Sequence, residues 1–235
     1  MAQSHTAKAF DQELERLTNS ICAMGDFAGK QFTDAVHALL HGDETLAFRV
    51  IDQDRQLDAM RRDLLASAAL VIARRQPIAS DLNEVLGDFK VVENLERIGD
   101  LAKNIAKRAT AITSAAFPDD LVQSLVKLSS IASEQLRRAL ATFAAPNAEE
   151  AMAVRQHDEA IDRLHTEVFR ELVSRMSTDQ SQVVGYVHLL FSAKNIERIG
   201  DHATHIAEAA YWKATGHEPE SERGRTDESS TFSGS

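Results

Sequence analysis

The sequence predicts an all-α protein of six helices, arranged as two tandem, pseudo-symmetric three-helix bundles. Apolar residues recur every three or four positions over most of the 235 residues, and only four prolines interrupt this pattern. One stretch also occurs twice, as NLERIGDLAKNIA at 94–106 and NIERIGDHATHIA at 195–207, with nine of thirteen positions identical. Copies that start 101 residues apart indicate two copies of one structural unit.

The first repeat is expected to span residues 6–114. Apolar residues step by threes and fours from Phe10 to Leu39, which predicts one long amphipathic helix over about 6–40. Asp43 then follows a glycine and is suited to cap a second helix that runs to about Arg75. In this second helix Asp54 occupies a position where the apolar period would place a hydrophobic residue.

A third helix is expected after the Gln76-Pro77 break. Asp81, with Glu84 three residues later, has the spacing of a capping box, and the apolar pattern continues to about Thr113. Its inward stripe leads to Glu96, so the repeated motif begins on the inward face of the helix. The short break at 115–120 is the expected boundary between the repeats.

The second repeat, residues 118–215, follows the same plan. A fourth helix is expected at about 120–143, and Asn147 with Glu150 offers a capping box for the fifth helix. The sixth helix is expected to start after residues 177–179 and to end near Thr215. Residues 216–235 are rich in charged residues, Ser and Gly, which predicts a disordered tail.

Composition limits the possible functions. With 36 acidic and 26 basic residues, a formal net charge of −10 and no Lys/Arg block, the chain is not expected to bind nucleic acid. Its single cysteine, Cys22, fits a reducing compartment and a core thiol. No signal peptide is visible, and the longest apolar run, 64–73, is too short to span a bilayer, so we expect a cytoplasmic protein that meets a membrane only through partners.

Carboxylates are the candidate functional groups. In each repeat one helix carries D-x-x-x-D at a stripe position and the next helix carries E-x-x-x-D, and a spacing of four stacks such side chains on one helix face. A glycine between the acids of the second pattern, Gly99 or Gly200, indicates close approach by a neighbouring helix. If the paired helices pack side by side, two clusters form: Asp54, Asp58, Glu96 and Asp100, and Asp158, Asp162, Glu197 and Asp201.

Four clustered carboxylates need a counter-charge, because two unit charges about 4 Å apart repel by ~4 kcal/mol at an effective dielectric constant near 20. Protons, arginines or metal ions could supply it. Oxygen ligands without cysteine favour magnesium, calcium, manganese or iron, although the identity of the divalent or trivalent ion, zinc included, stays open. The alternative is a set of interhelical salt bridges to arginine; the candidate arginines are Arg61, Arg97, Arg163 and Arg198.

Histidines add little to this pattern. His205 stands where the first motif has Asn104 and could add a nitrogen ligand, although an exposed or hydrogen-bonded histidine is the simpler interpretation. His202 and His165 are weaker candidates. Duplication of all eight acids favours metal sites over salt bridges alone.

Catalysis is not expected. A di-iron helical bundle, acting as an oxidase or a metal-storage protein, is the competing chemical hypothesis, but such sites use Glu-x-x-His pairs. The nearest fragment here is Asp162-x-x-His165, in one repeat only. The sequence also contains no Gly-rich phosphate loop, dinucleotide fingerprint or nucleophile with a base partner.

The two words NLERIGDLAKNIAKR and NIERIGDHATHIAE resemble the signature of the PhoU phosphate-transport regulators, and the resemblance extends over about residues 6–215. It implies a cytoplasmic, non-enzymatic negative regulator of phosphate uptake and phosphate-starvation signalling. Such proteins couple the Pst ABC transporter, through its ATPase subunit, to the PhoR sensor histidine kinase. The resemblance further implies a homodimer, and metal binding by the eight acids named above. His205, where the family more usually has Asn, is the one departure noticed.

Overall fold

The computed structural model describes residues 2–78, 80–112 and 117–219, with the side chains of 2–9 and 80 outside the description. These residues form six α-helices and one short 3-10 helix, without any strand. The elements are α1 (Ala2–His41), α2 (Glu44–Arg75), α3 (Ser80–Ala109), α4 (Asp119–Ala144), α5 (Ala148–Thr178), η1 (Gln180–Gln182) and α6 (Val183–Thr215). The predicted all-α fold of two three-helix repeats is therefore confirmed.

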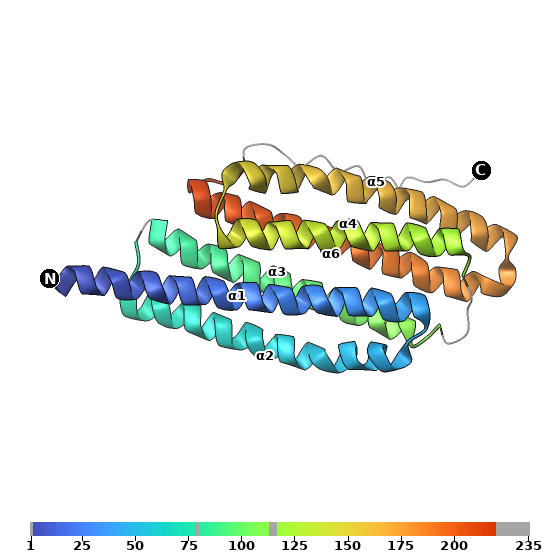
Figure 1. The fold of residues 1–235 in the computed structure, drawn as a ribbon, viewed down its shortest axis with the longest axis horizontal. Coiled ribbons are helices and arrows are strands. Elements are labelled where there is room, and N and C mark those ends of the chain that lie inside the picture. The colour runs from blue at the N-terminus through green and yellow to red at the C-terminus, as the bar shows by residue number, and fades with distance from the viewer. Residues whose placement is uncertain (1, 79, 113–116, 220–235) are drawn as a thin grey trace.

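The two repeats lie side by side, with all six helices running roughly along the long axis of the molecule (Figure 1). Helices α3 and α6, which carry the repeated motif, pack against each other at the centre, and α1 packs against α4. Within the described part of the chain, α2 contacts only α1 and α3, whereas α5 contacts α4, η1 and α6. The D-x-x-x-D helices therefore lie on the outer sides of the bundle, each against one central helix.

The helix ends follow from local chemistry. The Asp43 carboxylate accepts a hydrogen bond from the Leu46 amide at 2.9 Å and caps α2, as predicted. Asn147 caps α5 in the same way, through the Glu150 amide at 3.1 Å. Gly42 closes α1 with a φ of 66°, a left-handed conformation that glycine adopts without strain.

Two local predictions differ from the structure, and one short element was not predicted. Asp81 lies inside the first turn of α3 rather than at its cap, because the helix already begins at Ser80. The third helix ends at Ala109 instead of near 113, and residues 113–116 lie outside the described residues. The 3-10 turn η1 was not predicted. Of the expected tail, 216–219 are described and 220–235 lie outside the description, so its disorder stays a prediction.

One continuous hydrophobic core runs through both repeats, and its largest fully buried side chains come from both halves of the chain. The motif glycines admit close helix packing, as predicted. A Cβ at Gly99 would overlap Leu57 Cδ2 of α2, and a Cβ at Gly200 would lie 2.7 Å from Ile161 Cδ1 of α5. Each outer helix therefore packs a large apolar side chain against the glycine of its central helix.

Charged groups also occur inside the interface between the repeats. Lys213 of α6 pairs with Glu84 of α3 at 2.8 Å, and its amino group donates to the Thr18 hydroxyl at 3.2 Å. Asp88 lies one turn from Glu84 and is 1% exposed. Burial raises the pKa of the Asp88 carboxyl to about 7, even though Lys213, 3.9 Å away, lowers it.

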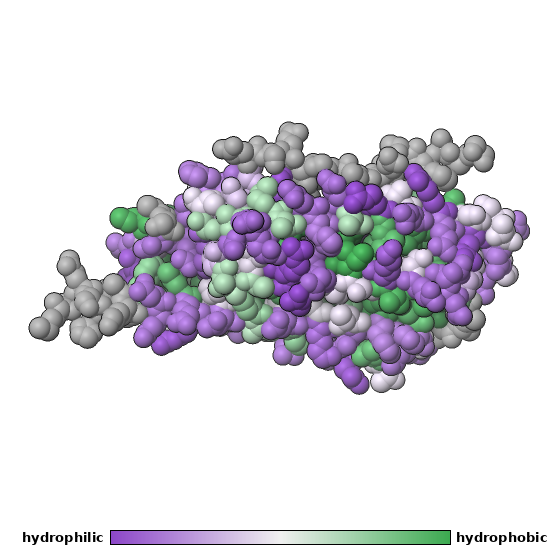
Figure 2. Space-filling model, turned by 45° about the horizontal axis from the view of Figure 1, so that its top comes forward, coloured by the Kyte–Doolittle hydropathy of each residue, from purple (hydrophilic) through white to green (hydrophobic). Residues whose placement is uncertain are grey.

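The surface is mainly hydrophilic, with smaller hydrophobic areas between polar side chains on the face in Figure 2. No helix in the described ranges combines the length and the apolar character needed to cross a membrane.

The close packing at Gly99 gives a first testable prediction. Gly99→Ala should lower the free energy of unfolding by ~1–2 kcal/mol, because the overlap with the buried Leu57 outweighs the gain of ~1 kcal/mol in helix propensity. Gly87→Ala is the matched control on the same helix, since its Cβ would have no neighbour closer than 3.9 Å, and it should stabilise by ~0.5–1 kcal/mol. Urea unfolding measures both; equal shifts of the same sign would contradict the packing argument.

Candidate functional site

The structure brings two of the predicted acids of the first repeat, Asp54 and Asp100, around one lysine. Lys103 of α3 lies 2.7 Å from Asp54 of α2 and 2.7 Å from Asp100 of its own helix. Burial lowers the pKa of the Lys103 ammonium, but its hydrogen bonds to Asp100 and Asp54 raise it above its ordinary value overall. The ammonium is therefore the counter-charge that links α2 to α3.

Glu96 is less well compensated. Its Oε2 is buried without a hydrogen-bond partner, and the Nε of Arg97 is 3.5 Å away. Burial raises the pKa of the Glu96 carboxyl, and the nearby Asp100 carboxylate raises it further. Asp58, one turn after Asp54, is half-buried, and Arg61 beside it pairs with Glu93 at 2.6 Å. The first cluster thus holds more negative charge than Lys103 alone neutralises.

The second cluster is more deeply buried and differently bonded. Asp158, Asp162 and Glu197 are each at most 5% exposed. Gln135 of α4 donates from its Nε2 to Asp158 Oδ1 at 3.0 Å and also lies 3.1 Å from the Gly200 carbonyl oxygen. The Thr204 hydroxyl donates to the same Asp158 oxygen at 3.1 Å. Neutral polar groups from α4 and α6 therefore bond to Asp158.

Glu197 also has a cationic neighbour, since Lys194 pairs with it at 2.9 Å. Asp201, on the same helix as Glu197, is half-buried. Lys103 thus joins Asp54 of α2 to Asp100 of α3, and Thr204 of α6 bonds to Asp158 of α5, which agrees with the side-by-side packing expected for the paired motif helices. Convergence of all eight acids stays a prediction.

The two repeats differ at the position of Lys103, whereas a glutamine occurs in both. A shift of 101 residues places Thr204 on Lys103, and a shift of 104 places Gln135 on Gln31. Gln31 is 1% exposed, and neither of its amide atoms has a hydrogen-bond partner. In the first repeat Asp54 accepts a hydrogen bond from Lys103, whereas in the second repeat Asp158 accepts one from Gln135.

Carboxylate oxygens dominate both clusters, and these are the ligand atoms that hard cations prefer. Glu96 Oε2 is buried without a hydrogen bond, and its ion pair with Arg97 is long, at 3.5 Å, which is consistent with a site for a closer positive charge. In the arrangement observed, however, no three His, Cys, Asp or Glu side chains of the described residues lie close enough together to hold a metal ion. Metal binding at the eight acids therefore stays a prediction, and an ion would have to replace the contacts of Lys103.

The arginines proposed as alternative partners account for only part of the neutralisation. Arg97 lies 3.4 Å from Asp100, but Arg163 pairs with Glu159 on its own helix at 3.5 Å, outside the cluster. Lys103 and Lys194 were not predicted as partners, although each lies three residues from an acid of the motif, a spacing that favours pairing on a helix.

A histidine of the second motif lies between the repeats. His202 Nδ1 is 2.9 Å from the Asn94 side-chain oxygen of α3, and its ring meets the His205 ring edge to face. Burial, together with the nearby His205, Arg198 and Arg97, lowers the pKa of His202 to about 4. The ring is therefore neutral at physiological pH and serves as a polar contact between α3 and α6.

Two three-helix repeats, each with an E-x-x-x-D helix packed against a D-x-x-x-D helix, define a class of tandem-repeat helical bundle with paired acidic clusters. The family model of the PhoU domain matches residues 21–109 and 125–210, one match in each repeat. The chain belongs to the PhoU family.

Relatives agree with this assignment. The phosphate-specific transport system accessory protein PhoU homolog of Rhizobium meliloti is 44% identical over 232 residues, covering 99% of this chain and 98% of the relative. The homolog from Zymomonas mobilis is 38% identical, covering 94% and 93%. These proteins are accessory regulators, not enzymes, so the prediction of a non-catalytic protein is confirmed and the oxidase alternative is not supported.

Solved structures have the same fold. The crystal structure of PhoU from Pseudomonas aeruginosa superposes with a TM-score of 0.84 at 35% identity, covering 88% of this chain and all of that one. A PhoU structure from Streptococcus pneumoniae, at 24% identity and a TM-score of 0.83, covers 90% of this chain and 99% of its own.

Removing the shared ammonium should destabilise the first repeat. Lys103→Met is expected to lower the free energy of unfolding by ~1–3 kcal/mol at pH 8, because Asp54 and Asp100 lose their counter-charge in a partly buried site. Urea unfolding measures the loss. Lys107→Met, exposed on the same helix, should change stability by less than ~0.5 kcal/mol, and an equally small change in Lys103→Met would contradict this account.

His202 should make stability depend on pH. Its pKa of about 4 in the folded chain lies below the ordinary value of 6.5, so the unfolded chain binds more protons between these values. Stability should therefore fall by ~1–2 kcal/mol as the pH drops from about 7 to 4, a value reduced for partial exposure. In His202→Gln this slope should become shallower, whereas His41→Gln, an exposed position on α1, should keep it; chemical unfolding across this pH range measures both.

Proposed function

We propose that this protein is a regulator of phosphate uptake and phosphate-starvation signalling that links the Pst transporter, through its ATPase subunit, to a PhoR-type sensor kinase. The observation that carries the proposal is similarity over 99% of the chain, at 44% identity, to a phosphate-specific transport system accessory protein. A non-catalytic helical bundle suits an adaptor, since such a protein acts by contacting other proteins. We place it in the cytoplasm, where the kinase and the ATPase subunit expose their soluble domains, and as a homodimer.

We further propose that each acidic cluster holds a metal ion when one is supplied. Asp54, Asp58, Glu96 and Asp100 would hold it in the first repeat, and Asp158, Asp162, Glu197 and Asp201 in the second. The ion would supply the positive charge that the first cluster draws from Lys103 in this arrangement. The buried Glu96 Oε2 without a hydrogen bond, and the raised pKa of Glu96, support a need for further positive charge there.

Elemental analysis of the purified protein by mass spectrometry tests the metal proposal, after incubation with iron, manganese, magnesium, calcium and zinc. We expect bound metal in the native protein and none in a variant with Glu96, Asp100, Glu197 and Asp201 changed to alanine. Lys103→Met should bind metal about tenfold more tightly in the first repeat, because the ion no longer competes with an ammonium. Equal metal content in all three proteins, or none in any, would return the carboxylates to a purely structural role.

Expression of phosphate-starvation genes tests the regulatory proposal. Cells that carry Asp100→Ala with Asp201→Ala should lose repression in phosphate-rich medium if the clusters serve regulation. Asp52→Ala with Asp119→Ala is the matched control, since both of these acids are exposed. Intact repression by a variant that has lost its metal would reject a regulatory role for the metal, and intact repression in cells that lack the protein altogether would reject the proposed function.

A further inference from the structure

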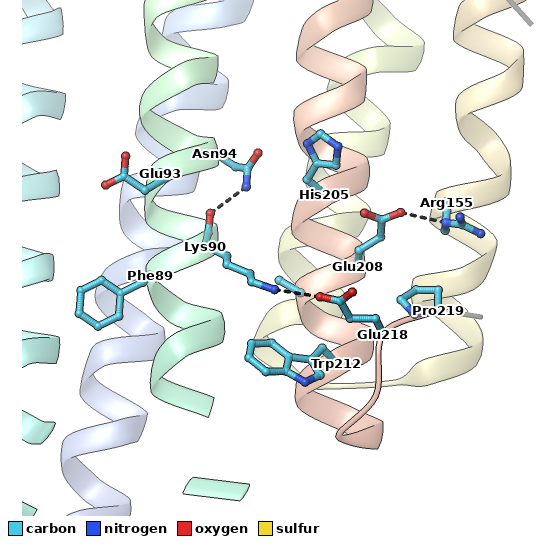
Figure 3. Close-up of a pocket in the computed structure, with 11 residues that line it drawn as sticks. Phe89, Lys90, Glu93, Asn94, Arg155, His205, Glu208, Trp212, Glu218 and Pro219 are labelled. Atoms are coloured by element: carbon cyan, nitrogen blue, oxygen red, sulfur yellow. Dashed lines mark hydrogen bonds and ion pairs between the residues drawn. The ribbon is translucent and has the colours of Figure 1, made fainter. Parts of the chain in front are cut away.

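A pocket lies between the two repeats, and none of the eight acids of the two clusters lines it. It has a volume of about 650 Å³ and is bounded by α3, α5, α6 and the segment that follows α6 (Figure 3). Its wall combines an aromatic surface, mainly Trp212 and Phe89, with charged side chains from both repeats. The metal-site proposal for the acidic clusters therefore assigns no role to this pocket.

The chain itself reaches across this pocket. α6 ends at Thr215, and Gly216 follows with a φ of 77°, the left-handed conformation that turns the chain away from the helix axis. The Thr215 hydroxyl then bonds to both the amide and the carbonyl of His217, at 3.2 and 3.1 Å. These bonds direct the segment His217–Pro219 back over the bundle instead of away from it.

The segment is attached through one ion pair. Glu218 Oε1 lies 3.3 Å from the Nζ of Lys90 on α3, 128 residues earlier in the chain (Figure 3). The same amino group stands 4.3 Å from the centre of the Trp212 ring, a cation–π distance. An anionic group at this position is therefore held over an aromatic surface by one lysine.

The other acids of the pocket already have partners on the helices. Glu93 pairs with Arg61 at 2.6 Å, and Glu208 pairs with Arg155 at 2.9 Å. Lys90, in contrast, has its carboxylate partner among the described residues in the post-helix segment, not on a helix. Without Glu218 the helical wall would present an ammonium next to Trp212 and no carboxylate to pair with it.

The contact is also weak enough to exchange. The Glu218 side chain is 78% exposed and that of Lys90 is 51% exposed, and exposed ion pairs of this kind contribute little stability. Pro219 cannot continue a helix and favours an extended backbone before it, which suits a segment that lies across a pocket as a bound peptide would.

We propose that this pocket is a docking site for an acidic peptide segment of a partner protein, and that the chain's own segment His217–Pro219 occupies the site until the partner displaces it. Glu218 stands in for a partner carboxylate on Lys90, and Trp212 supplies the apolar contact that binding sites often draw from tryptophan. The proposed adaptor function enters only as the source of the partner; recognition of an acidic segment follows from the pocket itself.

A titration with the full-length protein tests the proposal, using the synthetic peptide acetyl-His-Glu-Pro-Glu-amide as probe. Trp212 is the only tryptophan in the chain, so its fluorescence reports on this pocket alone. Glu218→Lys should change the emission in the absence of peptide and should bind the probe about threefold more tightly than the native protein, because the internal competitor is repelled from Lys90. Adding Lys90→Met to this variant should abolish binding.

The controls separate charge from docking. Asp52→Lys makes the same change of charge at an exposed position of α2 and should leave both the emission and the affinity at native values. A probe with both glutamates replaced by glutamine should not bind. No binding of the acidic probe, equal affinity for the native and Glu218→Lys proteins, or binding that survives Lys90→Met would each overturn the proposal.

Two further measurements distinguish the remaining outcomes. If Glu218→Lys reduces the sedimentation coefficient to that of a smaller species, the segment bridges two copies, and its contact within one chain is overturned. Gene repression is scored separately in the Glu218→Lys and Lys90→Met cells. Normal repression together with the predicted peptide binding would keep the docking site and reject only its link to the proposed adaptor function.

Discussion

Close approach of an outer helix to the glycine of a central helix is the constraint on which both acidic clusters depend. Leu57 of α2 fills the space beside Gly99, and Ile161 of α5 fills the space beside Gly200. Because the helices meet so closely, carboxylates on the facing turns are partly or wholly removed from water, where an unpaired charge is costly. The requirement for a counter-charge, from a lysine, a polar network or an ion, therefore follows from the packing of apolar side chains.

The two repeats meet this requirement in different ways, although their acids are the same. The first repeat uses the Lys103 ammonium, whereas the second places Thr204 at the same position and recruits Gln135 of α4. A charge is replaced by neutral hydrogen bonds, and the second cluster is the more deeply buried of the two. An ion would therefore encounter Lys103 at Asp54 and Asp100 in the first repeat, and Lys194 at Glu197 in the second.

The junction of α3 and α6 connects the repeats through polar contacts of several kinds. His202 meets Asn94, Lys213 meets Glu84, and Lys90 lies over Trp212. These contacts lie on the same two helices as the E-x-x-x-D motifs, so a change of charge in a cluster and a change of occupancy at the pocket act on shared elements. A partner bound at the junction would contact both repeats at once.

The sequence by itself determined the six helices, the internal repeat, the caps at Asp43 and Asn147 and the helices that carry the acids, because these depend on helical periodicity and on neighbours a few residues apart. Only the tertiary structure decided which groups neutralise those acids and where the chain forms a pocket. Lys103 reaches Asp54 across 49 residues, and Glu218 reaches Lys90 across 128. Such pairings depend on helix spacing and on the direction of long, flexible side chains, and no local pattern in the sequence encodes either.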